Sequence, residues 1–238
     1  MEPVDILTIA AHPDDVELTC GGTLLKMVDQ GYSVGILDLT QGEMGTRGTP
    51  ELRAEEAEAA ANVLGARFRK RLNLGDSRLT TSIENRLAVA QEIRLAQPKT
   101  IILPYWEGRH PDHYTAATLG YEACYAAGLK KLDLDGEPHR PRKILYSTIY
   151  WDVEPSFVVD ISPQFDRKIE AVNCFASQFE GDMDEIMKLF PAWGRLIDRI
   201  RTQCRFYGHQ AGVEYAEPFV VKEVVVIDDI VEMPAPSI

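Results

Sequence analysis

Three residues of types that bind metals or transfer protons stand within four consecutive positions near the N-terminus: His12, Asp14 and Asp15. They follow an apolar run, Val4 to Ala10, that predicts a buried strand of a parallel sheet. They precede a segment, Val16 to Gln30, whose leucines and valines have helical spacing. The three residues therefore lie on a strand-to-helix turn. In open α/β sheets such turns lie at the carboxyl ends of the strands, where ligands bind, so the chemistry and the predicted location agree.

Two histidines and an aspartate stand together again further along the chain, in the segment 108–113 (Gly-Arg-His-Pro-Asp-His). This second group follows another strand-like run, Thr100 to Pro104, so both groups are expected at the same edge of one sheet. Two histidines and one carboxylate are the ligands of a catalytic zinc that keeps one position open for water. His12, Asp15 and one histidine of the second group supply that set.

The spacing alone does not say whether His110 or His113 is the ligand. If His113 is the ligand, Asp14 and His110 are left over from the two groups and are free for other roles in the reaction. A carboxylate beside the water of such a site serves as a general base, and a histidine three residues before a ligand is well placed to act on the substrate oxygen. Asp112 has two interpretations of equal weight, orienting a histidine or capping the next helix. A lone first group would fit a structural histidine and a helix cap equally well, but the second group favours the metal site.

The motif Ala-His-Pro-Asp-Asp-x-Glu over 11–17, with the later His-Pro-Asp-His over 110–113, resembles the LmbE/PIG-L family of zinc-dependent N-acetylglucosaminide deacetylases. The resemblance implies a three-layer, Rossmann-like α/β fold with a mostly parallel central sheet, and it assigns the second histidine ligand to His113. The segments 41–56 and 212–219 are similar to the bacillithiol-biosynthesis branch of that family, which deacetylates N-acetyl-α-D-glucosaminyl L-malate. These matches span nearly the whole chain.

The resemblance implies hydrolysis of the acetamide on C2 of a glucosamine unit. Because an amine leaves readily only when protonated, Asp14 is expected to take a proton from the attacking water and deliver it to the nitrogen. An amidase acting on bacillithiol S-conjugates, a deacetylase of another N-acetylglucosaminide and a catalytically silent sugar-binding protein remain alternatives, although the intact Asp14 weighs against the last. Because the chain lacks a G-x-G-x-x-G motif, a dinucleotide-binding oxidoreductase is a much less favoured class than a metal-dependent hydrolase. Fe²⁺ suits the same ligands as Zn²⁺.

A malate conjugate is anionic, and a chain of net charge −12, with 37 acidic and 25 basic residues, would repel it unless local cations compensate. The candidate substrate-binding residues are Arg47, Arg53 and Arg109, because each lies in or beside a loop expected at the active edge, and a guanidinium grips a carboxylate bidentately. Arg53 also lies in the first turn of a helix predicted over 50–64, where a cation is disfavoured by about 0.3–1 kcal/mol. A bound anion would explain its presence. Surface salt bridges are the alternative for all three, and we favour that interpretation for Arg47.

Length and composition limit the class of protein. At 238 residues and 45% hydrophobic content, we expect a single domain over 1–238. The acidic balance disfavours nucleic-acid and anionic-membrane partners, and no apolar run approaches the ~20 residues of a membrane span. Four scattered cysteines without a C-x-x-C pair fit free thiols in a reducing cytosol. We therefore expect a cytoplasmic, homo-oligomeric enzyme that acts on a small amino-sugar conjugate.

The remaining pattern alternates between strand and helix. Further strands are predicted at 33–40, 68–74, 144–151, 157–161 and 220–227. Further helices are predicted at 50–64, 85–96, 113–128, 164–178 and 187–207.

Overall fold

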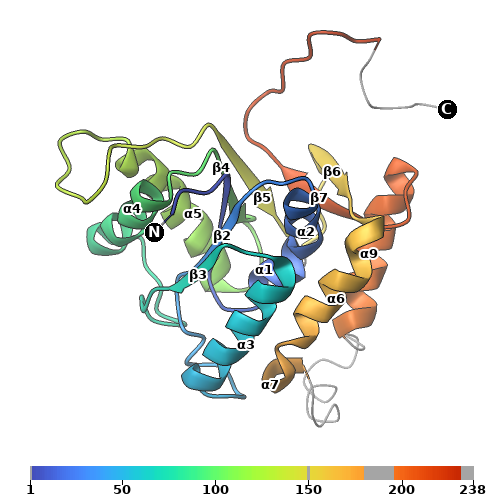
Figure 1. Ribbon diagram of the computed structural model, residues 1–238, viewed down its shortest axis with the longest axis horizontal. Coiled ribbons are helices and arrows are strands. Elements are labelled where there is room, and N and C mark those ends of the chain that lie inside the picture. Colours follow the sequence, from blue (N-terminus) through green and yellow to red (C-terminus); the bar gives the residue numbers. More distant parts are fainter. Residues whose placement is uncertain (1, 149–150, 180–195, 232–238) are drawn as a thin grey trace.

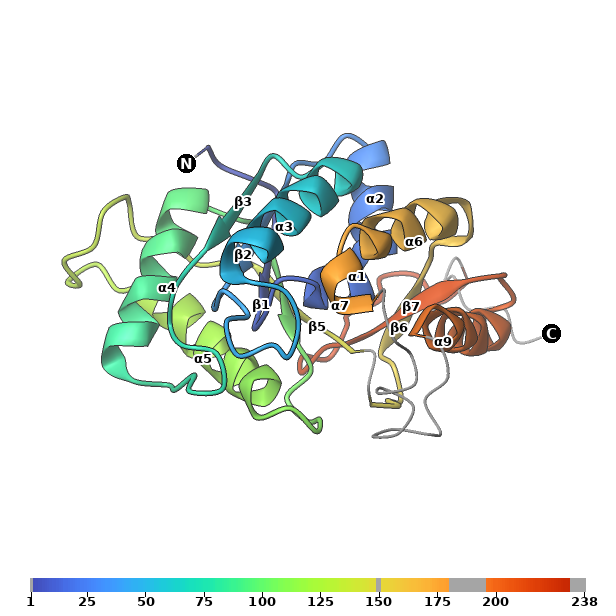
Figure 2. The same ribbon diagram turned by 90° about the horizontal axis from the view of Figure 1, so that it is seen from below.

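The computed structural model describes residues 2–148, 151–179 and 196–231. Its strands form one seven-stranded sheet in the order β3-β2-β1-β4-β5-β7-β6, with helices on both faces (Figures 1 and 2). The strands are β1 (Ile6–Ala10), β2 (Val34–Asp38), β3 (Phe68–Arg71), β4 (Thr100–Pro104), β5 (Lys143–Ser147), β6 (Phe157–Asp160) and β7 (Ala216–Val220). The helices are α1 (Asp15–Thr19), α2 (Gly21–Asp29), α3 (Pro50–Leu64), α4 (Ile83–Ala96), α5 (Pro111–Ala127), α6 (Phe165–Asn173), α7 (Ala176–Phe179) and α9 (Leu196–Ala211), with a 3-10 turn at Ser162–Gln164.

The sheet is parallel from β3 to β5, and β7 runs antiparallel to both β5 and β6. All five residues of β1 are buried, because helices cover both faces of the sheet at this strand. Its Leu7 and Ile9 pack in a cluster with α4 and α5, whereas Ile6 and Ala10 pack in a second cluster with α2. Figure 2 shows these helices on opposite sides of the strands. The expected α/β class with a mostly parallel sheet is confirmed.

The pairing of β1 with β4 decides where the chemistry lies. Ile6 is in register with Thr100 and Thr8 with Ile102, and the two strands run parallel. Parallel neighbours end at the same edge of a sheet, so the turn after β1 and the loop after β4 leave the sheet side by side. The predicted juxtaposition of the two histidine-containing groups is therefore confirmed.

The helix predicted over 16–30 is in fact two helices, because the chain breaks at Cys20 and α2 begins at Gly21. The carboxylate of Glu217 accepts hydrogen bonds from the backbone N–H groups of Gly22 (2.9 Å) and Thr23 (2.7 Å). It also pairs with the ammonium of Lys168 at 2.6 Å, and both side chains are fully buried. A carboxylate at a helix N-terminus satisfies N–H groups that have no partner within the helix.

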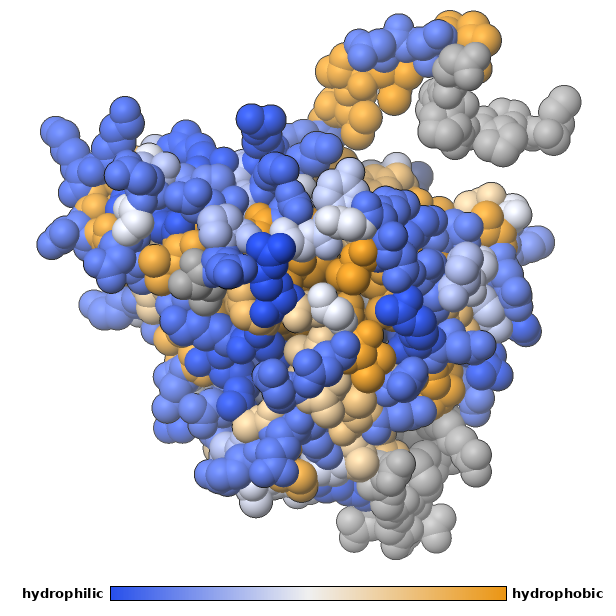
Figure 3. Space-filling view, viewed as in Figure 1, coloured by the Kyte–Doolittle hydropathy of each residue, from blue (hydrophilic) through white to orange (hydrophobic). Residues whose placement is uncertain are grey.

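The prediction of a strand over 220–227 is wrong. The strand is β7, which ends at Val220, and its Glu217 and Pro218 hid it from an apolar pattern. The valines beyond it have strand propensity but no neighbouring strand in the described chain, and Val224 is 93% exposed. Figure 3 shows this hydrophobic run extending away from the body of the molecule.

Other boundaries also differ. The helix predicted over 164–178 is divided into α6 and α7, β5 ends at Ser147, and β2, β3 and β6 are shorter than predicted. Of the helix predicted over 187–207, residues 187–195 lie outside the described residues, and α9 covers the remainder and continues to Ala211. No helix in the described ranges is both long and apolar enough to cross a membrane.

Replacing Lys168 with Met should lower the free energy of unfolding by about 3–5 kcal/mol, because Glu217 would be left charged in the core without its partner. Arg167→Met is the matched control on the same helix, since Arg167 forms a half-exposed pair with Asp29 at 2.8 Å. That pair should contribute about 1 kcal/mol or less. Urea unfolding measures both values, and equal losses for the two variants would contradict a stabilising role for the buried pair.

Candidate metal centre

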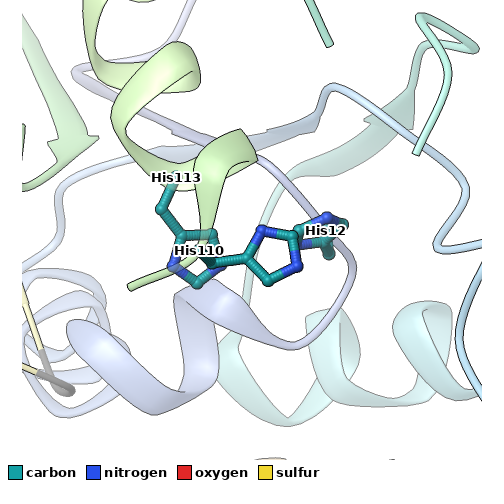
Figure 4. A group of neighbouring side chains, drawn as sticks. All are labelled: His12, His110 and His113. Atoms are coloured by element: carbon teal, nitrogen blue, oxygen red, sulfur yellow. The ribbon is translucent and has the colours of Figure 1, made fainter. Parts of the chain in front are cut away.

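Asp15 lies between two histidines, one on the turn after β1 and one in the first turn of α5. Its Oδ2 atom is 3.4 Å from Nδ1 of His12, and its Oδ1 atom is 3.1 Å from Nε2 of His113. Two ligands at 2.0–2.1 Å from a tetrahedral Zn²⁺ stand about 3.3 Å apart, so each of these two contacts has the length expected between neighbouring ligands of one ion. His12 and Asp15 are each 8% exposed. Figure 4 shows His12 on the turn after β1, facing His110 and His113 at the start of α5.

The opposite side of the His12 ring contacts two further carboxylates. Nε2 of His12 is 3.2 Å from Oδ2 of Asp112 and 3.3 Å from Oδ1 of Asp76. Burial opposes a charge on the ring, but hydrogen bonds to Asp112, Asp15 and Asp76 outweigh it and raise the pKa of His12 to about 12. This environment favours a positive charge, and a metal ion can supply one in place of a proton.

Two sets of residues around His12 have ligand atoms close enough together to hold an ion: His12 with His110 and His113, and His12 with Asp76 and Asp112. The second set would use Nε2 of His12. However, Asp112 already accepts the backbone N–H of Ser77 (2.7 Å), and Asp76 accepts that of Met44 (2.9 Å). Carboxylates in that position hold the proton on Nε2 and leave the Nδ1 lone pair for a metal. The geometry therefore favours His12, Asp15 and His113.

His110 has a different environment from His113. Its Nδ1 accepts the backbone N–H of Asp112 at 3.2 Å, so it is His110 that caps α5, and the capping interpretation of Asp112 is wrong. Burial, together with the neighbouring rings of His12 and His113, lowers the pKa of His110. A neutral ring that accepts at Nδ1 carries its proton on Nε2. His110 is therefore equipped to act on the substrate oxygen as a neutral hydrogen-bond donor.

Asp14 precedes α1 in an unusual backbone conformation, with φ 113° and ψ −28°, and its side chain makes no capping bond. Its Oδ2 atom is 3.0 Å from Nη2 of Arg53. Burial raises the pKa of Asp14 to about 7, against the opposing attraction of Arg53. A carboxyl group that titrates near neutrality beside a metal site has the properties of a general base.

The three candidate arginines lie in three different environments. Arg109 lines a cleft together with Asp15 and His113. Arg53 is 4% exposed and its guanidinium donates to the carboxylate of Asp14. Arg47 is half-buried in the loop before α3, and its carbonyl accepts a hydrogen bond from Gln178.

Sequence reasoning missed Asp76 as a partner of His12. The available signal was its place in the loop after β3, at the same edge of the sheet as the two histidine-containing groups. The sequence also gave no indication of most of the residues that line the cleft. The other side chains and backbone groups there belong to Thr8, Ile9, Ala10, Val16, Thr19, Pro104, Tyr105, Glu107, Gly108, Ser147, Thr148 and Trp151.

An α/β sheet that brings a two-histidine, one-carboxylate set and an adjacent carboxylate to the ends of two parallel strands defines a metal-dependent hydrolase site. Residues 7–124 match the model of the PIG-L family, GlcNAc-PI de-N-acetylase. A diacetylchitobiose deacetylase from Thermococcus kodakarensis is 33% identical over 228 residues, which cover 89% of this chain and 80% of that protein. The chain belongs to the PIG-L family of deacetylases, and it is an enzyme of the hydrolase class.

More distant relatives and solved structures agree with this placement. A probable N-acetyl-alpha-D-glucosaminyl L-malate deacetylase 2 from Bacillus cereus is 27% identical over 76% of this chain and 86% of its own. The conserved protein TT1542 from Thermus thermophilus has a similar structure, with a TM-score of 0.85, 39% identity and coverage of 94% of this chain and 98% of that one. The N,N'-diacetylchitobiose deacetylase from Pyrococcus horikoshii gives a TM-score of 0.77 and 29% identity over 91% of this chain and 82% of its own.

His12→Ala, Asp15→Ala and His113→Ala should each purify with little bound metal, because each removes one of three ligands. Asp14→Asn should keep its metal and lose turnover by about 100-fold or more, the scale for a general base. His209→Ala is the control, since His209 is exposed on α9. Elemental analysis and rate measurements on the same samples test the assignment. A metal-free Asp14→Asn, or an active and fully metallated His113→Ala, would contradict it.

Proposed function

We propose that the chain hydrolyses the N-acetyl group of an N-acetylglucosaminide and releases acetate and the free amine. The observation that carries this proposal is the bridging of His12 and His113 by Asp15, with Asp14 adjacent in sequence and a cleft that is lined by Asp15 and His113. Zinc, or Fe²⁺ as the alternative, would be held by the two histidines and Asp15. When bound, such an ion lowers the pKa of a water and polarises the acetyl carbonyl.

The chain's own residues then handle the protons and the charge. Asp14 accepts a proton from the attacking water and returns it to the amide nitrogen, which must be protonated to leave. His110 donates from Nε2 to the carbonyl oxygen as negative charge develops there. Asp112 and Asp76 keep the His12 ring in the tautomer that leaves Nδ1 for the metal.

The lining of the cleft favours an uncharged sugar beside the reacting unit. The hydroxyls of Thr19 and Thr148 and the half-exposed indole of Trp151 suit a carbohydrate, which combines hydroxyls with apolar ring faces. The single arginine of the cleft, Arg109, shares its lining with two carboxylates, those of Glu107 and Asp15. The similarity to the Thermococcus deacetylase supports the same choice, so an N-acetylated chito-disaccharide is our preferred substrate class.

The malate conjugate of bacillithiol biosynthesis is the second candidate. Two observations favour it: Arg109 lies in the cleft, and the Bacillus relative is similar over 76% of this chain. The position of Arg53 weighs against it, because the guanidinium that was expected to bind malate instead faces Asp14. An anionic ligand would then depend on Arg109 beside Glu107.

Acetate release from N,N'-diacetylchitobiose and from N-acetylglucosaminyl malate decides between the two. The metal-loaded enzyme should show the higher kcat/KM with the disaccharide, and a chelator should abolish release from both until Zn²⁺ is restored. Arg109→Ala should reduce kcat/KM for malate more than for the disaccharide, because only malate needs the cation. A tenfold preference for malate would establish the second candidate, and no acetate from either substrate would overturn the proposed function.

A further inference from the structure

Arg53 carries a permanent charge in the first turn of α3, yet its side chain is only 5% exposed. Its Nη2 donates to the Oδ2 atom of Asp14 at 3.0 Å and to the carbonyl of Pro13. Its Nη1 lies 3.4 Å from the carbonyl of Gly42. The guanidinium therefore binds both the backbone and the side chain of the turn that carries the proposed base.

The loop after β2 is shaped to admit this guanidinium. Gly42 has φ +66°, and a Cβ atom there would lie 2.5 Å from Nη1 and 2.6 Å from Cζ of Arg53. Its own N–H donates to the hydroxyl of Thr40, which in turn donates to the carbonyl of Ala11. The glycine thus leaves the space that the guanidinium occupies, and hydrogen bonds fix this loop to the turn after β1.

Asp14 needs such support because its backbone is strained. A φ of 113° is rare for a residue with a side chain and costs on the order of 1–3 kcal/mol, so it persists only where the surroundings impose it. Arg53 binds the carbonyl of Pro13 immediately before this residue and the carboxylate of the residue itself. These are the two groups whose relative direction changes when φ of Asp14 changes.

We propose that Arg53 is a positioning residue, which holds Asp14 in the strained conformation from which its carboxylate acts, and that Gly42 makes the room for it. This inference rests on the proposed function, in which Asp14 transfers the proton. A displacement of about 1 Å in a reacting group can reduce a rate by about 100-fold. Arg53 therefore affects kcat through Asp14 and leaves substrate binding unchanged.

Arg53→Ala, Arg53→Lys and the control Arg167→Ala test the role of the guanidinium. Arg53→Ala should lower kcat by about 100-fold with KM within about twofold and metal content unchanged. Methylguanidinium should restore part of kcat in Arg53→Ala, while NaCl at equal ionic strength should not. Arg53→Lys keeps the charge with a different donor geometry, so its loss should be smaller. Arg167→Ala, which removes an exposed arginine, should behave as the parent enzyme.

A raised KM with unchanged kcat in Arg53→Ala would make Arg53 a substrate-binding residue and overturn the proposal. If Arg53→Ala does not fold, Arg53→Lys supplies the same comparison of kcat with KM. The crystal structure of the better-folded variant adds a readout that needs no substrate. There φ of Asp14 should return to negative values, and an unmoved Asp14 would refute the proposal. An inactive parent enzyme would instead count against the proposed function, and the backbone of Asp14 would still test Arg53.

Discussion

The structure depends on one carboxylate shared between two strands. Asp15, the first residue of α1, contacts His12 on the turn after β1 and His113 in the first turn of α5. This contact is possible because β1 and β4 are parallel neighbours that end together. Around it stand Asp14, Asp76 and Asp112, so the first requirement of the site is a positive charge. We propose that a metal ion held by His12, Asp15 and His113 meets that requirement and would supply the reactivity of a hydrolase.

Buried cationic side chains bind Asp14 and the residues of α1 that follow it. Arg53 from α3 binds Asp14, Arg69 from β3 binds Glu17 at 2.7 Å, and Lys168 from α6 donates to the carbonyl of Leu18 at 2.8 Å. Each cation is paired with a carboxylate, which makes its burial possible. The turn after β1 and helix α1 are therefore fixed by three elements that lie apart in the sequence, and Asp14 can be kept in its strained conformation.

The sequence predicted the features that follow from local periodicity and from the geometry of parallel sheets. These include the alternating class, the helix at 50–64 and the meeting of His12 with the segment 108–113. It did not predict features that need a distant partner. The break before Gly21 depends on Glu217, 195 residues from Gly22, and the anion that Arg53 binds is Asp14 of the same chain. The apolar run after Val220 failed as a strand because propensity alone supplies no pairing partner.

We propose that the ion binds on the Nδ1 side of His12, between Asp15 and His113, while Nε2 stays hydrogen-bonded to Asp76 and Asp112. Anomalous X-ray diffraction from crystals of the metal-loaded protein tests it most directly. We expect one strong peak about 2.0–2.2 Å from Nδ1 of His12, an oxygen of Asp15 and Nε2 of His113. A peak bound by Nε2 of His12 with Asp76 and Asp112 would contradict it.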